Sequence, residues 1–127
     1  MNGKKILIVD DEFDIVELLK LRLEINGFSV RTAFDGIEAL EKIEAEIPDL
    51  VLMDVKMPRL NGYKVTKALR ENPKTRDLPI LIITAMSKYT SNIAEQCRDM
   101  GINAVFYKPF DSGQLLAKIR ECLQLAA

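Results

Sequence analysis

The sequence predicts a doubly wound α/β fold, in which helices cover both faces of a five-stranded parallel sheet. Five short apolar segments alternate with five segments of helical periodicity along 127 residues, a length typical of one domain. The apolar segments lack the polar alternation of half-exposed strands, so we expect strands that are buried on both faces. Strands that alternate with helices imply right-handed crossovers and a parallel sheet. The expected architecture is therefore a three-layer sandwich.

Each expected strand is short and rich in β-branched or other apolar residues, which favours buried β-structure. The five segments are Ile6–Val9, Phe28–Ala33, Leu50–Met53, Ile80–Thr84 and Ala104–Tyr107.

The first two helices have well-marked ends. The first carries an apolar face and stops at Asn26 and Gly27, a pair suited to a left-handed C-cap. The second begins at Asp35, and Glu38 follows at the spacing of a capping box. Pro48 prevents that helix from continuing. The expected core positions are Ile15, Val16, Leu19 and Leu23 in the first helix and Ile37, Leu40 and Ile43 in the second.

Turn residues also delimit the other three helices. The third is expected over Tyr63–Glu71, between Gly62 and Pro73. The fourth ends at Gly101, and its start lies among Ser87, Thr90 and Ser91. The fifth begins at Asp111, with Gln114 at capping-box spacing. The expected core positions are Ile93, Ala94, Cys97 and Met100 in the fourth helix and Leu115, Leu116, Ile119 and Leu123 in the fifth.

Composition argues against several classes of function. The chain has 18 basic and 19 acidic residues and a formal net charge of -1, which provides no general attraction for nucleic acid or anionic lipid. Its apolar runs are far shorter than the ~20 residues that cross a bilayer, and its first residues do not form the apolar stretch that a signal peptide would need. We expect a soluble, cytoplasmic protein with no membrane insertion and no direct contact with nucleic acid.

The cysteine and histidine contents limit the chemistry further. Cys97 and Cys122 lie on apolar helical stripes, and without a secretion signal we expect free thiols. The chain contains no histidine, which excludes imidazole bases and histidine-ligated zinc from its own residues. Any histidine chemistry must come from a partner.

In a doubly wound sheet the functional crevice lies beyond the carboxyl ends of the strands. Five polar residues are expected there: Asp10, Asp11, Asp54, Thr84 and Lys108. Two carboxylates ~4 Å apart repel by about 4 kcal/mol at an effective dielectric constant of ~20, so three converging acids require a cation or a proton. Oxygen ligands favour a hard ion such as magnesium or calcium, and a site with few protein ligands suits magnesium.

The other two residues could hold an anion in the same crevice. Thr84 supplies a hydroxyl and Lys108 a positive charge, which together suit a phosphoryl group. Asp54 is then a candidate nucleophile that forms an acyl phosphate. Each residue alone has a simpler structural explanation, such as a helix cap, a turn or a strand position. It is their conjunction at the ends of four strands that indicates a functional site.

Four motifs closely resemble the receiver domains of two-component signalling, and the resemblance spans the whole chain. They are Ile6–Glu12 (ILIVDDE), Asp54–Gly62 (DVKMPRLNG), Thr84–Ala85 (TA) and Lys108–Phe110 (KPF). The resemblance implies a flavodoxin-like (βα)5 fold with strand order 2-1-3-4-5, a receiver domain over residues 1–127 and no output domain in this chain. A stand-alone regulator and a receiver cut from a longer protein would look the same.

The resemblance also implies roles for individual residues. Asp54 would be the phosphoacceptor, and Asp11 and Asp54 would bind Mg²⁺. Asp10 would hold a metal-bound water, and Lys56 would offer its backbone carbonyl to the metal. Thr84 and Lys108 would contact phosphoryl oxygens, small Ala85 would leave room for them, and the bond before Pro109 would be cis.

The implied partners are a sensor histidine kinase or a histidine phosphotransfer protein, which donates the phosphoryl group, and a downstream protein target. Partner specificity would lie in exposed residues of the first, fourth and fifth helices. The domain would assist its own phosphorylation and dephosphorylation without being an enzyme for a separate substrate.

The sequence departs from the receiver pattern near its last strand. Receivers often carry an aromatic residue three positions before the lysine, where this chain has Val105. We expect Phe106 and Tyr107 to have the wrong register to replace that residue. Asn103 and Ala104 stand where receivers of winged-helix transcription factors often carry two aspartates used in dimer contacts, which argues against that dimer.

Two hypotheses follow from these departures. Phosphorylation would shift the loop after Thr84 and the fourth helix, which a partner detects. Lys56 and Met86, beside the expected pocket, would affect how readily water attacks the acyl phosphate.

Rival interpretations fit the sequence less well. A haloacid-dehalogenase-type phosphatase needs Asp-x-Asp after the first strand, but Glu12 occupies the second position. A flavodoxin would bind FMN phosphate where Asp10, Asp11 and Glu12 would repel it. No Gly-x-x-x-x-Gly-Lys loop is present. The remaining alternative is a receiver-fold interaction module that acts without phosphorylation.

Overall fold

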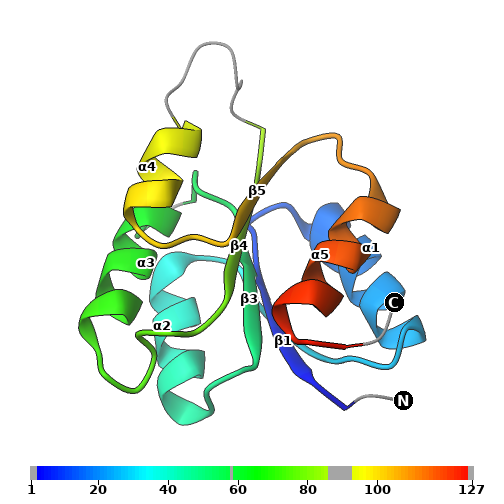
Figure 1. Ribbon diagram of the computed structural model, residues 1–127, viewed down its shortest axis with the longest axis horizontal. Coiled ribbons are helices and arrows are strands. Elements are labelled where there is room, and N and C mark those ends of the chain that lie inside the picture. Colours follow the sequence, from blue (N-terminus) through cyan, green and yellow to red (C-terminus); the bar gives the residue numbers. More distant parts are fainter. Residues whose placement is uncertain (1–2, 58, 86–92, 126–127) are drawn as a thin grey trace.

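The computed structural model describes residues 3–57, 59–85 and 93–125. Within these ranges, strands and helices alternate along the chain (Figure 1). The elements are β1 (Lys5–Val9), α1 (Phe13–Ile25), β2 (Ser29–Ala33), α2 (Gly36–Ala45), β3 (Leu50–Met53), α3 (Gly62–Glu71), β4 (Ile80–Thr84), α4 (Ile93–Asp99), β5 (Ala104–Tyr107) and α5 (Ser112–Cys122).

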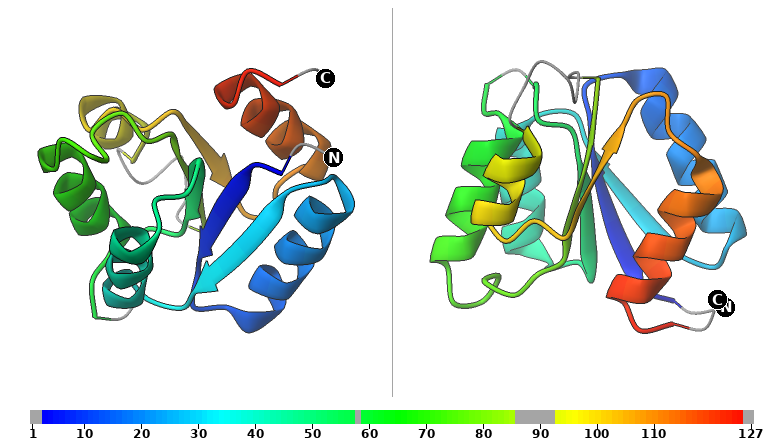
Figure 2. Two further views of the ribbon diagram at one scale, coloured as in Figure 1. Left: turned by 90° about the horizontal axis from the view of Figure 1, so that it is seen from below. Right: turned by 45° about the horizontal axis from the view of Figure 1, so that its top comes forward.

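The strands form one parallel sheet in the order β2-β1-β3-β4-β5. Helices α1 and α5 cover one face of the sheet, and α2, α3 and α4 cover the other (Figure 2). This arrangement confirms the predicted doubly wound fold and its strand order. The strand order reverses between β1 and β3, which places their carboxyl ends at the point where such sheets open a crevice.

The core consists of two apolar clusters, one on each face of the sheet. Along β1, Leu7 and Val9 contribute to the cluster with α2, α3 and α4, whereas Ile6 and Ile8 contribute to the cluster with α1 and α5. This alternation follows from the two-residue period of a strand. Both sets are at most 1% exposed, because helices cover both faces. Burial on both faces explains why Ile6–Val9 of β1 are apolar throughout.

Most predicted helix ends are confirmed. The Asp35 carboxylate accepts a hydrogen bond from the Glu38 backbone N–H at 2.8 Å, and Asp111 accepts one from Gln114 N–H at 2.9 Å. Gly27 has a φ of 92°, the left-handed conformation expected beyond the end of α1. The start of the fourth helix was predicted among residues 87–91, which lie outside the described residues.

Some element bounds and one core position differ from the predictions. Helix α3 begins at Gly62 rather than Tyr63, with Asn61 as its N-cap. Ile37 is 37% exposed, and Ala39, which is fully buried, faces the core in α2. The sequence pattern favoured Ile37, which has the larger apolar side chain, but the helix register places Ala39 against the sheet.

Both cysteines are free, as predicted. Cys97 is buried in α4, and burial raises the pKa of its thiol to about 11. The thiol is therefore protonated at neutral pH and behaves as a small apolar side chain. No helix within the described residues is both long and apolar enough to span a bilayer.

A single arginine joins α3 to the two loops that flank β4 and β5. The Arg70 guanidinium donates hydrogen bonds to the carbonyl oxygens of Leu78 at 2.8 Å and Arg76 at 3.0 Å in the α3–β4 loop. It also donates to Gly101 at 2.9 Å and Met100 at 3.3 Å, after α4. Only the fork of a guanidinium can reach both loops with separate N–H groups.

Replacing this guanidinium should destabilise the fold. Arg70→Ala leaves several partly buried carbonyl oxygens without donors, and we expect the free energy of unfolding to fall by about 2–3 kcal/mol. Urea denaturation followed by circular dichroism measures the change. Arg70→Lys should recover less than half of it, because one ammonium cannot span both loops. An Ala variant within about 0.5 kcal/mol of wild type, the range of ordinary surface substitutions, would contradict this role.

Candidate functional site

The register of the sheet brings two aspartates together at its carboxyl edge. Val9 in β1 is the register partner of Met53 in β3, so the residues that follow, Asp10 and Asp54, leave neighbouring strands at the same level. The Asp54 N–H continues the ladder by donating to Val9 O at 2.9 Å. Asp10 is fully buried and Asp54 is 4% exposed. Two carboxylates are thus held at the inner end of the crevice.

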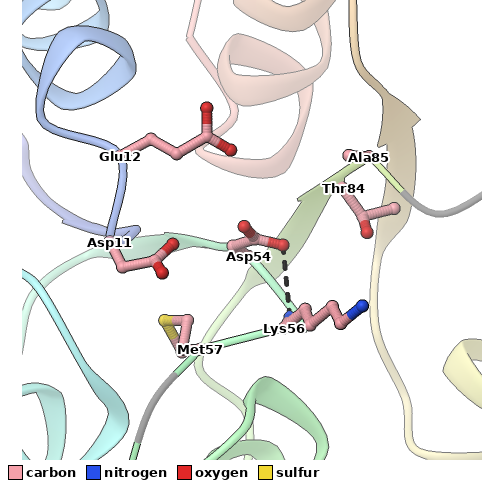
Figure 3. A pocket seen from close by; sticks show the side chains of 7 residues that line it. All are labelled: Asp11, Glu12, Asp54, Lys56, Met57, Thr84 and Ala85. Carbon is pink, nitrogen blue, oxygen red and sulfur yellow. Dashed lines mark hydrogen bonds between the residues drawn. The ribbon is translucent and has the colours of Figure 1, made fainter.

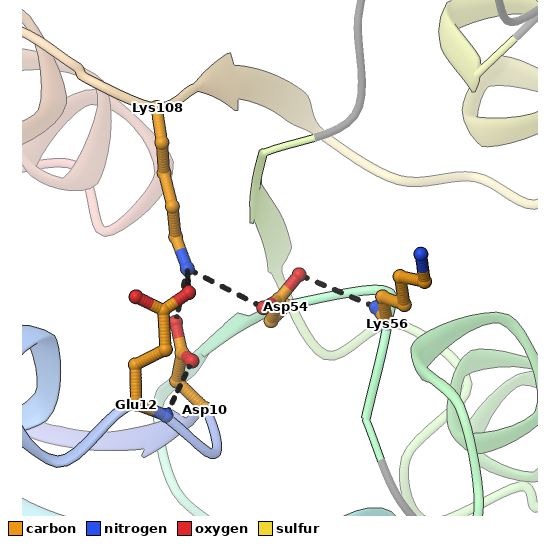
Figure 4. A network of polar contacts seen from close by, with 5 residues as sticks. All are labelled: Asp10, Glu12, Asp54, Lys56 and Lys108. Carbon is orange, nitrogen blue, oxygen red and sulfur yellow. Dashed lines mark hydrogen bonds and ion pairs between the residues drawn. The ribbon is translucent and has the colours of Figure 1, made fainter.

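Lys108 reaches these carboxylates from β5. Its backbone N–H donates to Thr84 O at 2.7 Å, which fixes the chain where β5 ends. Its ammonium lies 2.9 Å from Asp10 Oδ2, 3.0 Å from Glu12 Oε1 and 3.3 Å from Asp54 Oδ2 (Figure 4). The Lys108–Pro109 peptide bond is cis, as expected. One ammonium therefore serves three carboxylates from two loops.

Backbone donors hold the other carboxylate oxygens. Asp10 Oδ1 accepts a hydrogen bond from the Glu12 N–H at 3.0 Å, and Asp54 Oδ1 accepts one from the Lys56 N–H at 3.3 Å. The Lys56 ammonium lies on the opposite side of Asp54 from Lys108 (Figure 4). Its side chain therefore takes no part in the acid cluster. The predicted role of its backbone carbonyl as a metal ligand stays a prediction.

A pocket of about 560 Å³ opens above Asp54. Asp11 points toward Asp54 from the β1–α1 loop, and Thr84 and Ala85 form the opposite wall at the end of β4 (Figure 3). Thr84 is fully buried, whereas Ala85 is exposed. The structure thus brings all five predicted strand-end residues to one site. Met86, predicted beside the pocket, lies outside the described residues.

Among the described residues, the electrostatics of the site set the burial of two carboxylates against the charge of Lys108. Burial raises the pKa values of Asp10 and Asp54, despite opposing hydrogen bonds and the charge of Lys108. The negative charge of Asp11 raises the pKa of Asp54 further. Burial alone would lower the pKa of Lys108, but its hydrogen bonds to Asp10 and Glu12 outweigh this, and the net shift is upward. Lys108 therefore remains charged, and the acids remain short of positive charge.

The donor atoms fit a hard divalent cation. Carboxylate oxygens of Asp10, Glu12 and Asp54 all lie within 4.8 Å of one another, whereas the predicted ligand Asp11 is not part of this group. All of them are oxygen ligands, the type that magnesium prefers. A second positive charge would offset the repulsion that one lysine leaves uncompensated.

Glu12 is the site residue that the sequence did not assign. We predicted Asp10, Asp11 and Asp54 as the acids, and Asp11 does line the pocket. Glu12, however, joins the cluster around Lys108. Its position at the N-cap of α1 gives an acidic residue an ordinary reason to be there. The one available signal was the unbroken run of three acids directly after a buried strand.

The register prediction for β5 was half wrong. Val105 and Tyr107 pack on the same cluster, on the side of α2, α3 and α4, and Phe106 packs on the other side. Residues two apart in a strand share a face, so only Phe106 is out of register with Val105. Tyr107 lies on the same face of the sheet as Val105, two residues nearer to Lys108.

Asn103 stands where receivers of winged-helix transcription factors often carry an aspartate used in dimer contacts. In this structure it makes contacts within the fold. Its side-chain Oδ1 accepts a hydrogen bond from Ile80 N–H, and its own N–H donates to Ile80 O, both at 2.9 Å. These bonds start the pairing of β5 with β4. The prediction about the dimer itself stays untested.

Comparisons with known proteins agree with this geometry. Residues 6–120 match the family model of the response regulator receiver domain. Response regulator MprA of Mycobacterium avium is 41% identical over 120 residues, which are 94% of this chain and 51% of that protein. This chain thus spans about half the length of the curated relatives it matches.

Two solved structures are similar over nearly their whole length. The chemotaxis response regulator CheY4 of Vibrio cholerae has a TM-score of 0.85 and 31% identity, over 95% of this chain and 99% of that chain. The receiver domain of sensor histidine kinase PA1611 of Pseudomonas aeruginosa has a TM-score of 0.86 and 30% identity, over 96% and 98%. That structure holds a magnesium ion in its active-site cleft.

The raised pKa of Asp54 predicts that Asp54→Asn stabilises the protein at pH 7 without divalent cations. Ionising Asp54 costs more in the folded state than in the unfolded chain, so its contribution to stability falls as pH rises through the raised pKa. The advantage of the variant should be present at neutral pH and lost below the unfolded value of 3.8. Urea denaturation between about pH 3 and pH 7 measures this.

Lys108→Met should have the opposite effect on the stability of the protein. It leaves buried carboxylates without their cation and should destabilise the protein by about 3 kcal/mol at pH 7. Equal stability of wild type and Asp54→Asn at pH 7 would contradict the stated balance of burial and charge.

Proposed function

Because the chain belongs to the response regulator receiver domain family, we propose that Asp54 accepts a phosphoryl group from the phosphohistidine of a partner and that this switches the binding of a downstream protein. The donor is a sensor histidine kinase or a histidine phosphotransfer protein. The observation that carries the proposal is the buried Asp54 carboxylate at the base of an open pocket, with Lys108 3.3 Å away.

The chemistry is an in-line displacement at phosphorus. An oxygen of Asp54 forms the new P–O bond while the P–N bond of the phosphohistidine breaks, and the imidazole leaves with the electron pair. Lys108 would stabilise the negative charge on the phosphoryl oxygens, and the Thr84 hydroxyl would donate to one of them. The chain itself contains no histidine, so the donor has to be another molecule or another part of a longer protein. The domain thereby assists its own modification and is not an enzyme for a separate substrate.

Magnesium is part of this proposal. Asp11 and Asp54 would bind the ion, together with the backbone carbonyl of Lys56, and Asp10 would hold one of its waters. The magnesium in the similar PA1611 receiver domain supports this. The ion would supply positive charge to both the acids and the phosphoryl oxygens.

The proposed partners meet different surfaces of the domain. Leu18, Leu21 and Ile25 on α1 are exposed apolar residues, 46%, 57% and 74% accessible, and suit contact with a phosphodonor in the cytoplasm. Output would follow from a shift of α4 and the segment after Thr84, which a target protein detects. The relatives are about twice as long as this chain, so the target could be covalently attached or separate.

Incubation with acetyl phosphate tests the phosphoacceptor role directly. We expect intact mass spectrometry to show one phosphate adduct on the wild-type protein with magnesium. Little or no adduct should form with EDTA, because the acids would then repel the donor. Asp54→Asn should remain unmodified under both conditions.

Measuring the stability of both proteins shows whether an unmodified variant is folded. Asp54→Asn is expected to be folded and at least as stable as wild type. Absence of an adduct on folded wild-type protein under every condition would refute the proposal. It would favour the alternative of a phosphorylation-independent interaction module.

Lys56 should affect the lifetime of the phosphorylated form. Its exposed side chain lines the pocket, and Lys56→Asn replaces the long stem with an amide that can hydrogen-bond to an incoming water. We expect the half-life of the adduct to shorten by about threefold, the factor for one weak hydrogen bond. Lys64→Asn, at an exposed position on α3, is the control. Equal half-lives for Lys56→Asn and wild type would exclude this influence.

A further inference from the structure

The Lys108 ammonium is held by a carboxylate that the proposed phosphorylation does not use. We propose that Glu12 is a positioning residue that retains Lys108 in the unphosphorylated state and thereby slows phosphorylation of Asp54. This inference rests on the proposed function and adds a control on its rate.

All the donors of Lys108 are already engaged. An ammonium has three N–H groups, and its three neighbours are Asp10, Glu12 and Asp54, at 2.9, 3.0 and 3.3 Å. A phosphoryl group on Asp54 brings further negative oxygens that need the same donors. Lys108 has to release a partner or share a donor before it can serve them fully.

Glu12 is the partner most easily released. Asp10 is fully buried, and its other oxygen is fixed by the Glu12 N–H. Asp54 is buried and is the reacting group itself. The Glu12 side chain, by contrast, is 53% exposed, so its carboxylate can rotate into water, where hydration offsets the loss of the ion pair. The ion pair between Glu12 and Lys108 is therefore the contact that opens.

Glu12 has no competing structural task among the described contacts. It stands at the N-cap of α1, but its side chain makes no capping hydrogen bond there. Its carboxylate instead extends from the β1–α1 loop to Lys108 after β5 (Figure 4). The side chain thus contributes to the position of Lys108 rather than to the start of the helix.

Two substitutions separate this contact from the general charge of the pocket. Glu12→Asp keeps the charge but shortens the side chain by one methylene, which withdraws the carboxylate from Lys108. Glu12→Gln keeps the length and removes the charge. If Glu12 restrains Lys108, both variants should be phosphorylated by acetyl phosphate about two- to fivefold faster than wild type, the range for one exposed ion pair. If only the charge matters, Glu12→Asp will match wild type and the inference fails.

A second measurement reports on Lys108 without phosphorylation. Brief acetylation with acetic anhydride, followed by peptide mass spectrometry, gives the reactivity of Lys108 relative to the other lysines. Loss of the ion pair should raise that reactivity about two- to fivefold in both variants. Unchanged reactivity in both would overturn the inference. Glu17→Gln, a charge removal at an exposed position of α1, should behave as wild type in both measurements.

Salt provides a further distinction from a purely structural effect. The Glu12 carboxylate is 53% exposed, so about 1 M sodium chloride should weaken its ion pair with Lys108, and the ratio of variant to wild-type phosphorylation rate should fall toward one. A ratio that does not change with salt would contradict an ionic restraint. Failure of the wild type to take up phosphate would overturn the proposed function. Unchanged Lys108 reactivity in a protein that does take up phosphate would overturn only the role of Glu12.

Discussion

The site depends on a shortage of positive charge around two buried carboxylates. Asp10 and Asp54 lose most of their hydration because β1 and β3 end inside the layered fold, and the Lys108 ammonium only partly compensates. Their pKa values are therefore raised. Such a site is stabilised by an added cation. It disfavours an added anion until a cation is bound. The same imbalance explains how metal affinity and phosphoryl acceptance could be linked in one pocket.

The imbalance persists because the backbone around Asp54 is tightly held. Helix α3 begins at Gly62, whose hydrogen would be replaced in alanine by a Cβ only 2.6 Å from the Asp54 carbonyl oxygen. The Gly62 N–H also donates to Val55 O at 2.8 Å. Only glycine lets the helix approach the strand end so closely. The acid therefore has little freedom to move toward water, and its chemical environment is set by the fold.

The fold and most of the site could be predicted from sequence because both follow from local patterns. Apolar runs mark buried strands, and polar residues directly after them must meet at one edge of a parallel sheet. What failed depends on three-dimensional detail. The choice of Ala39 over Ile37 requires the helix register, and the path of the Glu12 side chain requires the geometry of the loop. The error over Tyr107 was avoidable, since a period of two already places it with Val105.

Hydrogen bonds from α3 and from the segment before β5 hold the carboxyl end of α4. Arg70 binds the carbonyl oxygens of Met100 and Gly101, and Ile102 N–H donates to Cys97 O at 2.9 Å. The carboxyl end of α4 is therefore anchored to α3 and to the start of β5. The hydroxyl of Tyr63 is buried without a hydrogen-bond partner among the described residues, which costs free energy in the present conformation. A shift of α4 that preserves the Arg70 contacts must be largest at the end of the helix nearest Thr84, and a new partner for Tyr63 would favour it.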